Sequence, residues 1–108
     1  MRLILPVLVL VFVLTAAGNA ADVDGAAVFT SLKCGMCHKP DKKAAAVSLA
    51  EIGRAYMDKE KLVQLFKGDL KPLIESDKWG MMRPQLDKIK ALPDPEKDAL
   101  AGYVMGFK

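Results

Sequence analysis

Two cysteines and a histidine form the most informative group of reactive side chains in this sequence. Cys34 and Cys37 are separated by two residues, and His38 follows directly, in the run Cys34-Gly35-Met36-Cys37-His38. Thiols at this spacing on one helical turn can reach the two vinyl groups of a single porphyrin and form thioethers, which places the next histidine beneath the iron. The pattern predicts covalent attachment of one haem c, with His38 as the proximal iron ligand.

Three other interpretations of the cysteine pair compete with haem attachment. A thioredoxin-like dithiol belongs beside a βαβ pattern, which the sequence does not show. A structural zinc site needs four ligands, and Cys34, Cys37 and the single histidine supply only three. A structural disulfide is compatible with an exported protein, because oxidising compartments favour cystine. The complete motif, together with the export signal described next, favours haem over these three.

An apolar run near the N-terminus predicts export. Arg2 precedes apolar residues from Leu3 to Ala17, and small residues ending at Ala20 follow, which is the order of a secretory signal peptide. We expect residues 1–20 to be this signal, cleaved after Ala20, and residues 21–108 to form one domain. The run is short for a membrane span, which needs about 20 apolar residues, so no stable membrane insertion is expected after cleavage. An uncleaved anchor is the alternative.

The remaining domain is small and carries little net charge. It has 88 residues after removal of the first 20, and a chain of this size buries only about 60% of its unfolded surface, so a central cofactor would stabilise it. The chain has 16 Lys and Arg residues, one of which is Arg2 of the signal, and 13 Asp and Glu residues. Without Arg2, the net charge of the domain is +2. This charge is too mild to indicate binding to nucleic acid or a membrane surface. We expect a monomer.

Apolar residues recur at helical spacing along the domain with almost no strand alternation, which predicts an all-α fold. Asp24 is expected to cap a first helix that leads into the cysteine motif. Ser48 and Glu51 match a capping box at the start of a second helix, whose interior face is expected to include Tyr56. A third helix is expected to begin at Asp58 and to stop at Gly68.

The C-terminal third is predicted to contain one long connection and one helix. The connection extends from Asp69 to Pro84 and includes Trp79 and two methionines. Asp94 and Pro95 are expected to open the last helix, with Pro95 in its favoured first position.

These features resemble the small class I bacterial cytochromes c, over most of the predicted domain. That family pairs Cys-x-x-Cys-His near the mature N-terminus with a distal methionine near the C-terminus. The patterns Gly25-x-x-x-Phe29 and Leu100-x-x-Tyr103 are similar to the positions where its two terminal helices cross. The resemblance implies the small cytochrome c fold, in which short helices surround one covalently attached haem.

The resemblance also implies a methionine as sixth iron ligand. His38 is the single histidine, so a bis-histidine haem from this chain is excluded. Met82-Arg83-Pro84-Gln85 is similar to the methionine-proline segment of the family, which favours Met82 over the neighbouring Met81. The other candidates lie between the two cysteines or on predicted helices, where methionine is a common core residue: Met36, Met57 and Met105.

One part of the family pattern is missing. The family often has Gly-Pro and a leucine after the haem motif, where the proline carbonyl accepts the second N–H of the proximal histidine. Residues 44–49 read Ala-Ala-Ala-Val-Ser-Leu instead, so the hydrogen-bond partner of His38 is not identified by the sequence. Trp79 is similar to a family tryptophan whose indole N–H reaches a haem propionate, and a simple core role is the alternative.

Several lysines surround the motif: Lys33, Lys39, Lys42 and Lys43. In the family such lysines steer docking to acidic redox partners. The alternative is a merely solvated face, since mild charge clusters are common and weak steering is sensitive to salt.

The resemblance implies a periplasmic electron carrier rather than an enzyme. A thioether as sixth ligand would close the iron to oxygen and peroxide and favour single-electron transfer between redox proteins. The alternative function is a five-coordinate c-type haem protein with peroxidase or gas-sensing activity, which requires that neither Met81 nor Met82 binds the iron. A haem-free binding module with a Cys34–Cys37 disulfide is the third possibility.

Overall fold

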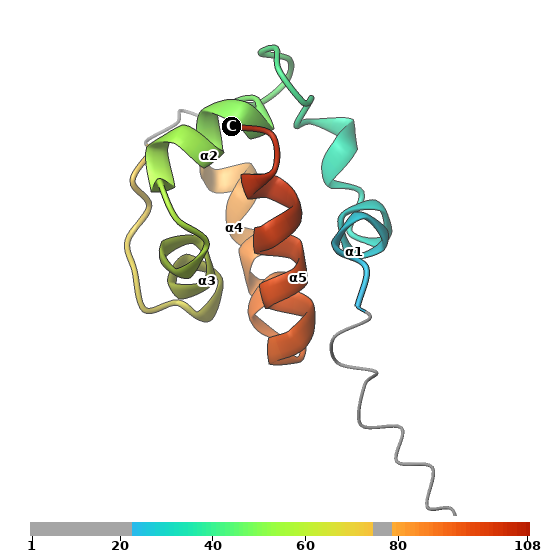
Figure 1. Cartoon of the computed structure of the whole chain (residues 1–108), viewed down its shortest axis with the longest axis vertical. Coiled ribbons are helices and arrows are strands. Elements are labelled where there is room, and N and C mark those ends of the chain that lie inside the picture. Colours follow the sequence, from blue (N-terminus) through green and yellow to red (C-terminus); the bar gives the residue numbers. More distant parts are fainter. Residues whose placement is uncertain (1–22, 75–78) are drawn as a thin grey trace, which may run out of the picture.

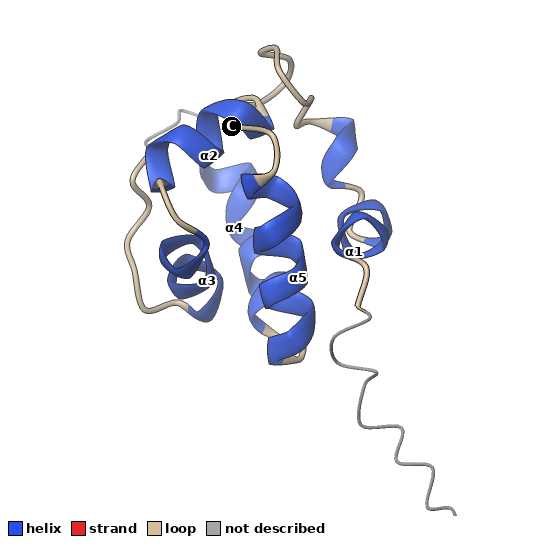
Figure 2. Ribbon diagram, in the orientation of Figure 1, coloured by secondary structure: helices blue, strands red, loops and turns tan. Residues whose placement is uncertain are grey.

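The computed structural model describes residues 23–74 and 79–108, and every regular element in these two ranges is a helix (Figures 1 and 2). The all-α class predicted from the sequence is confirmed. No described helix has the length and apolar character needed to cross a membrane. The predicted signal peptide, residues 1–20, lies outside the described residues. In chain order the elements are α1 (Gly25–Ser31), the 3-10 helix η2 (Cys34–Met36), α2 (Leu49–Tyr56), α3 (Lys59–Lys67), α4 (Trp79–Lys90) and α5 (Asp94–Met105).

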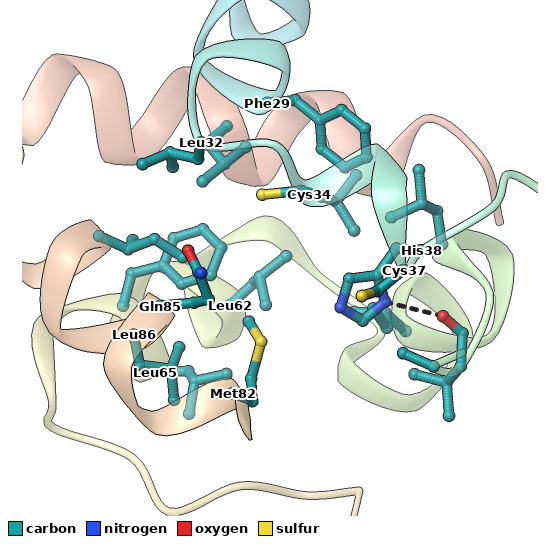
Figure 3. A pocket seen from close by; sticks show the side chains of 18 of the residues that line it. Phe29, Leu32, Cys34, Cys37, His38, Leu62, Leu65, Met82, Gln85 and Leu86 are labelled. Atoms are coloured by element: carbon teal, nitrogen blue, oxygen red, sulfur yellow. Dashed lines mark hydrogen bonds between the residues drawn. The ribbon is translucent and has the colours of Figure 1, made fainter. Parts of the chain in front are cut away.

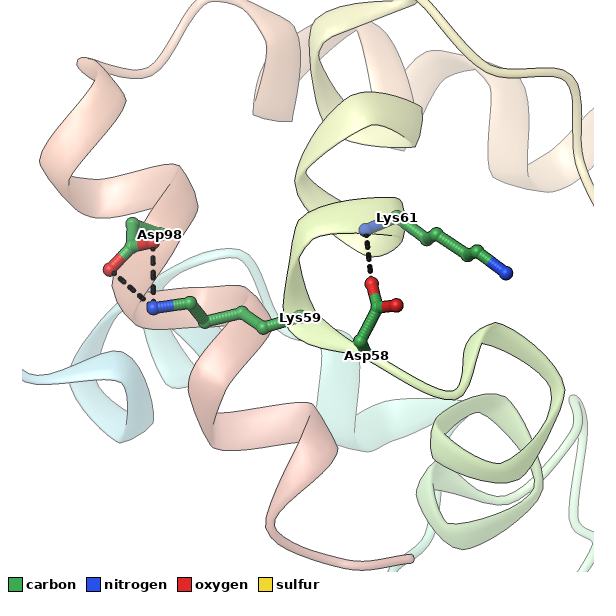
Figure 4. Close-up of polar contacts among 4 residues, drawn as sticks. All are labelled: Asp58, Lys59, Lys61 and Asp98. Carbon is green, nitrogen blue, oxygen red and sulfur yellow. Dashed lines mark hydrogen bonds and ion pairs between the residues drawn. The ribbon is translucent and has the colours of Figure 1, made fainter.

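Polar side chains begin the first three α-helices at the predicted residues. Asp24 caps α1 through its carboxylate. The Ser48 hydroxyl accepts a hydrogen bond from the Glu51 N–H at 3.1 Å at the start of α2. Asp58 caps α3 in the same way (Figure 4), and Gly68 ends that helix in the left-handed conformation, with φ of 84°. These local signals therefore set the bounds of the helices that surround the cysteine motif.

The predicted connection from Asp69 to Pro84 is wrong at its C-terminal end, because α4 already begins at Trp79 and contains Pro84. Proline lacks the N–H that would bond to the carbonyl four residues earlier, here that of Gly80. Gly80 is exposed, so water can satisfy this carbonyl in place of the missing donor. The helix therefore tolerates a proline that local sequence rules place at a helix boundary.

The two terminal helices pack against each other, as the sequence predicted. α5 begins at Asp94, one residue before the expected first position. A Cβ atom on Gly25 of α1 would overlap the carbonyl oxygen of Ala99 and lie 2.8 Å from Cβ of Tyr103, so a glycine is needed for this close approach. The rings of Phe29 and Tyr103, with centroids 5.1 Å apart, fill the crossing.

The core lies between the terminal helices and the three helices that follow the cysteine motif. Its largest fully buried side chains are Leu49, Leu62, Ile89 and Leu100, one each from α2, α3, α4 and α5. Four helices therefore enclose a single interior.

Candidate functional site

A cavity of about 290 Å³ lies within this interior (Figure 3). All five α-helices contribute to its walls, together with the cysteine segment and the loop that follows it. The walls are mostly aliphatic and aromatic. Among the described residues, the polar groups besides the cysteines belong to Lys33, His38, Tyr56, Trp79 and Gln85. Protein interiors are close-packed and have few voids larger than a water molecule. An apolar cavity of this size in so small a domain therefore fits a large apolar ligand.

The structure brings together the four residues that the sequence proposed for this site. Cys34, Cys37, His38 and Met82 all line the cavity. In Figure 3 the cysteines and the histidine lie on one side, and Met82 points in from α4 on the opposite side.

The cysteine motif forms a tight turn. The carbonyl of Cys34 accepts hydrogen bonds from the N–H groups of Cys37 at 3.2 Å and of His38 at 2.9 Å. Lys33, just before the turn, adopts the left-handed conformation with φ of 59°, which few residues other than glycine adopt. Both thiols are free and partly buried. Burial raises the pKa of the Cys34 thiol, and the neighbouring Cys37 adds to this effect, so this thiol is protonated at neutral pH.

The backbone of the following loop orients His38. Nδ1 of His38 lies 2.8 Å from the carbonyl oxygen of Val47. A carbonyl can only accept, so Nδ1 is the donor in this contact, and Nε2 is the ring nitrogen left for a metal. The loop is held in turn by hydrogen bonds from the Ala46 N–H to the Cys37 carbonyl at 3.1 Å and from the Leu49 N–H to the Lys39 carbonyl at 2.8 Å. Val47 is the partner that the sequence did not identify.

Two of the described methionines reach the cavity. Met82 is partly buried in its wall, whereas Met81 touches the cavity while 71% exposed. Met36 and Met57 are 72% and 65% exposed and do not line the cavity. Met105 packs on the hydrophobic core without lining the cavity. Met82 is therefore the methionine best placed to offer its sulfur to a ligand inside the cavity.

Two polar residues at the cavity were not predicted as part of the site. Oε1 of Gln85 is buried, and among the described residues it has no hydrogen-bond partner. Tyr56, expected only as an interior residue, is 3% exposed and accepts the N–H of Leu73 at 3.1 Å. Residues three apart share a helix face, so Gln85 is expected on the same face as Met82. This signal can be used only once the segment is known to be helical.

The lysines near the motif differ in their surroundings. Nζ of Lys39 donates to the carbonyl of Gly35 at 2.9 Å and so belongs to the motif's own hydrogen-bond network. Lys42 and Lys43 are exposed on the loop, and Lys33 lies at the edge of the cavity. A possible docking surface is therefore smaller than the four lysines in the sequence suggested. Trp79 lines the cavity at the start of α4, in agreement with either of its expected roles.

The residues present fit a haem attached by two thioethers. The donor set consists of two free thiols, an imidazole with one available nitrogen and a thioether, all at the same apolar cavity. This combination matches the covalent attachment and axial ligation of a c-type haem.

Comparison with known proteins agrees with this assignment. The family model described as cytochrome c matches residues 23–108, which include all the described helices and the whole cavity. No curated protein matches the chain. The chain belongs to the cytochrome c family, whose members are electron carriers rather than enzymes and hold haem c covalently through a cysteine pair.

Proposed function

We propose that this chain is a periplasmic monohaem cytochrome c that carries single electrons between larger redox proteins. In this proposal Cys34 and Cys37 hold one haem through thioethers, and His38 and Met82 are the two axial ligands of its iron. The bound haem supplies a reversible one-electron couple. The chain supplies attachment, ligation and an apolar surrounding.

The observation that carries the proposal is the orientation of His38 relative to Met82. The hydrogen bond to Val47 leaves Nε2 of His38 free to bind a metal, and Met82 points into the cavity from the opposite side (Figure 3). A flat macrocycle between these two side chains would receive one ligand on each face. This arrangement supports six-coordination over the five-coordinate alternative.

The chemistry of the two side chains favours electron transfer. A soft thioether sulfur stabilises ferrous iron more than a second imidazole would, and so raises the reduction potential. With both axial positions occupied by the protein, oxygen and peroxide have no open coordination site. The apolar walls contributed by residues such as Leu62, Phe66 and Ile89 keep water away from the centre of the cavity.

The proposal extends to location and partners. Residues 1–20 serve as a signal peptide that directs residues 21–108 to the periplasm, on the basis of the apolar run before Ala20. The domain is proposed to act there as a monomer. Redox proteins with acidic docking surfaces are the proposed partners, because Lys33, Lys42 and Lys43 lie beside the cysteine motif and are exposed.

Expression of the full chain in a bacterium that matures c-type haem tests the proposal. The periplasmic fraction should contain a protein with the mass of residues 21–108 plus one haem, and redox titration should show a single one-electron step. The variants Cys34→Ala and Cys37→Ala should each lose one thioether. Met36→Ala is the matched control, because Met36 lies between the cysteines but is exposed. A haem-free periplasmic protein would contradict the proposal.

A further inference from the structure

The ammonium group of Lys39 closes the turn of the cysteine motif. Nζ of Lys39 donates a hydrogen bond to the carbonyl oxygen of Gly35 at 2.9 Å, in a partly buried contact. The N–H groups of Cys37 and His38 both bond to the Cys34 carbonyl, and in the described part of the chain no backbone N–H reaches the carbonyl of Gly35. Lys39 therefore satisfies an acceptor that the turn leaves open, as lysines near helix ends can do.

Both partners of this hydrogen bond are held in place. A Cβ atom on Gly35 would lie 3.2 Å from Cε1 of Phe29, so Gly35 packs closely on this buried ring of α1. The backbone carbonyl of Lys39 accepts the N–H of Leu49 at 2.8 Å, at the start of α2. Lys39 is thus tied to α2 by its backbone and to the motif by its ammonium group.

No carboxylate neutralises Lys39 among the described residues. The ion pairs in that part of the chain involve other lysines, namely Lys59 with Asp98 and Lys97 with Asp94. The bond from Lys39 goes instead to a neutral carbonyl. Its side chain therefore brings an uncompensated positive charge to the motif.

We infer that Lys39 is a positioning residue that fixes a positive charge beside the haem and so raises the reduction potential. The inference rests on the proposed function, since it requires a haem attached to Cys34 and Cys37. Gly35 lies between these cysteines, so an ammonium group bound to its carbonyl stays next to the attached edge of the haem. Ferric haem carries one more positive charge than ferrous haem, and a fixed positive charge nearby disfavours the ferric form.

The neighbouring lysines should affect the haem differently. Lys42 and Lys43 are exposed on the following loop, where dissolved salt screens the field of a charge. A partly buried charge is screened much less. The effect of Lys39 on the potential should therefore persist at high salt, whereas that of Lys42 should disappear.

The first test compares Lys39→Met, Lys39→Arg and Lys42→Met in the haem-loaded full chain at pH 7, by redox titration at low and at high salt. At a fixed ambient potential, Lys39→Met should raise the ratio of ferric to ferrous haem roughly twofold or more at both salt concentrations. Lys39→Arg keeps the charge and a donor, so it should leave the ratio close to that of the unsubstituted protein. Lys42→Met is the matched control, and any shift that it causes should be smaller and vanish at high salt.

The second test separates the charge from the hydrogen bond. Nε-acetyllysine in place of Lys39 keeps the side-chain stem and an N–H group at Nζ but removes the charge. It should raise the ratio of ferric to ferrous haem as Lys39→Met does. Visible and near-infrared spectra of each variant show whether the iron ligands are unchanged, so that a loss of ligation is not mistaken for an effect of charge.

The outcomes separate this inference from the proposed function. An unchanged potential in both the Lys39→Met and the acetyllysine proteins, with intact haem ligation, would overturn the inference and leave Lys39 as a support of the turn alone. An equally large and salt-resistant shift in Lys42→Met would also overturn it, since the effect would then belong to overall charge. If Lys39→Met does not retain its haem, the acetyllysine protein decides. Loss of haem attachment in the unsubstituted protein would instead contradict the proposed function.

Discussion

A single backbone hydrogen bond determines how His38 can meet a metal. Because the Val47 carbonyl accepts from Nδ1 at 2.8 Å, the imidazole is held in one tautomer with Nε2 as the metal-binding nitrogen. The role of His38 follows from its place after Cys37, whereas any residue type can supply a carbonyl. The partner was therefore invisible in the sequence until the path of the loop was known.

Replacement of Met82 should change both the reduction potential of the haem and its binding of added ligands. Met82→Ala in the haem-loaded protein removes the soft ligand, so we expect the reduction potential to fall by on the order of 0.1 V. The iron should also bind added imidazole or cyanide more readily. Redox titration and visible spectra with these ligands measure both effects.

Met81→Ala is the matched control for this change. Met81 precedes Met82 on the same helix but is 71% exposed, so its removal should leave both the potential and ligand binding unchanged. If the two variants behave in the opposite way, Met81 is the ligand and the assignment of Met82 is wrong.

The sequence predicted ligand candidates better than it predicted their polar surroundings. Cys34, Cys37 and His38 follow from one motif, and Met82 was favoured by its similarity to a family segment, all without tertiary information. Tyr56 was recognised only as an interior side chain, because periodicity shows which face is buried but not that a hydroxyl meets a cavity.

At the level of helices, local rules succeeded where a side-chain cap marks the start. Asp24, Ser48 and Asp58 each cap the helix predicted from them. They failed at α4, because they predict that Pro84 ends a connection, whereas it lies inside the helix. One missing backbone bond at an exposed carbonyl costs little enough for the rest of α4 to continue through it. Such a tolerance depends on solvent exposure, which the sequence does not show.

The contact between the terminal helices predicts the effect of a single methyl group. Gly25→Ala should reduce the free energy of unfolding by about 1 to 3 kcal/mol, because the new Cβ would collide with backbone and side-chain atoms of α5. Urea unfolding followed by circular dichroism measures this change.

Gly102→Ala on α5 provides the control for this substitution. A Cβ there would meet only Cδ of Lys59 at 3.7 Å, an ordinary contact. Alanine is a better helix former than glycine, so this variant should gain up to about 1 kcal/mol. Equal effects of the two substitutions would contradict the close approach of α1 and α5 at Gly25.

For the whole molecule, the core and the functional site are the same space. The fully buried leucines and isoleucine of four helices lie around a cavity of about 290 Å³, which a domain of this size cannot leave empty without loss of packing. The sequence predicted this coupling from the small size of the domain. The haem is therefore expected to be a structural component as well as the redox centre.

The stability of the domain should decline in alkali through Tyr56. Burial raises the pKa of this phenol above its ordinary value of 10.0, and the hydrogen bond from Leu73 offsets part of the effect. Below pH 10 the phenol is protonated in the folded and unfolded chains. As pH rises toward the higher folded-state pKa, the unfolded chain loses its proton first, so stability falls by up to about 1.4 kcal/mol per pH unit.

Chemical unfolding of the protein and of Tyr56→Phe at several pH values above about 9 measures this effect. The stability of Tyr56→Phe should fall less steeply with pH than that of the unsubstituted protein. Equal slopes would show that the Tyr56 phenol does not control alkaline unfolding.

The central claim is that one covalent haem is ligated by His38 and Met82. The visible and near-infrared spectra of the haem-loaded protein, oxidised and reduced, test it most directly. We predict a low-spin ferric spectrum with a near-infrared band from methionine sulfur to ferric iron, which disappears in Met82→Ala, and a haem that stays attached after denaturation. A high-spin ferric spectrum would contradict the claim and favour an open-site haem protein.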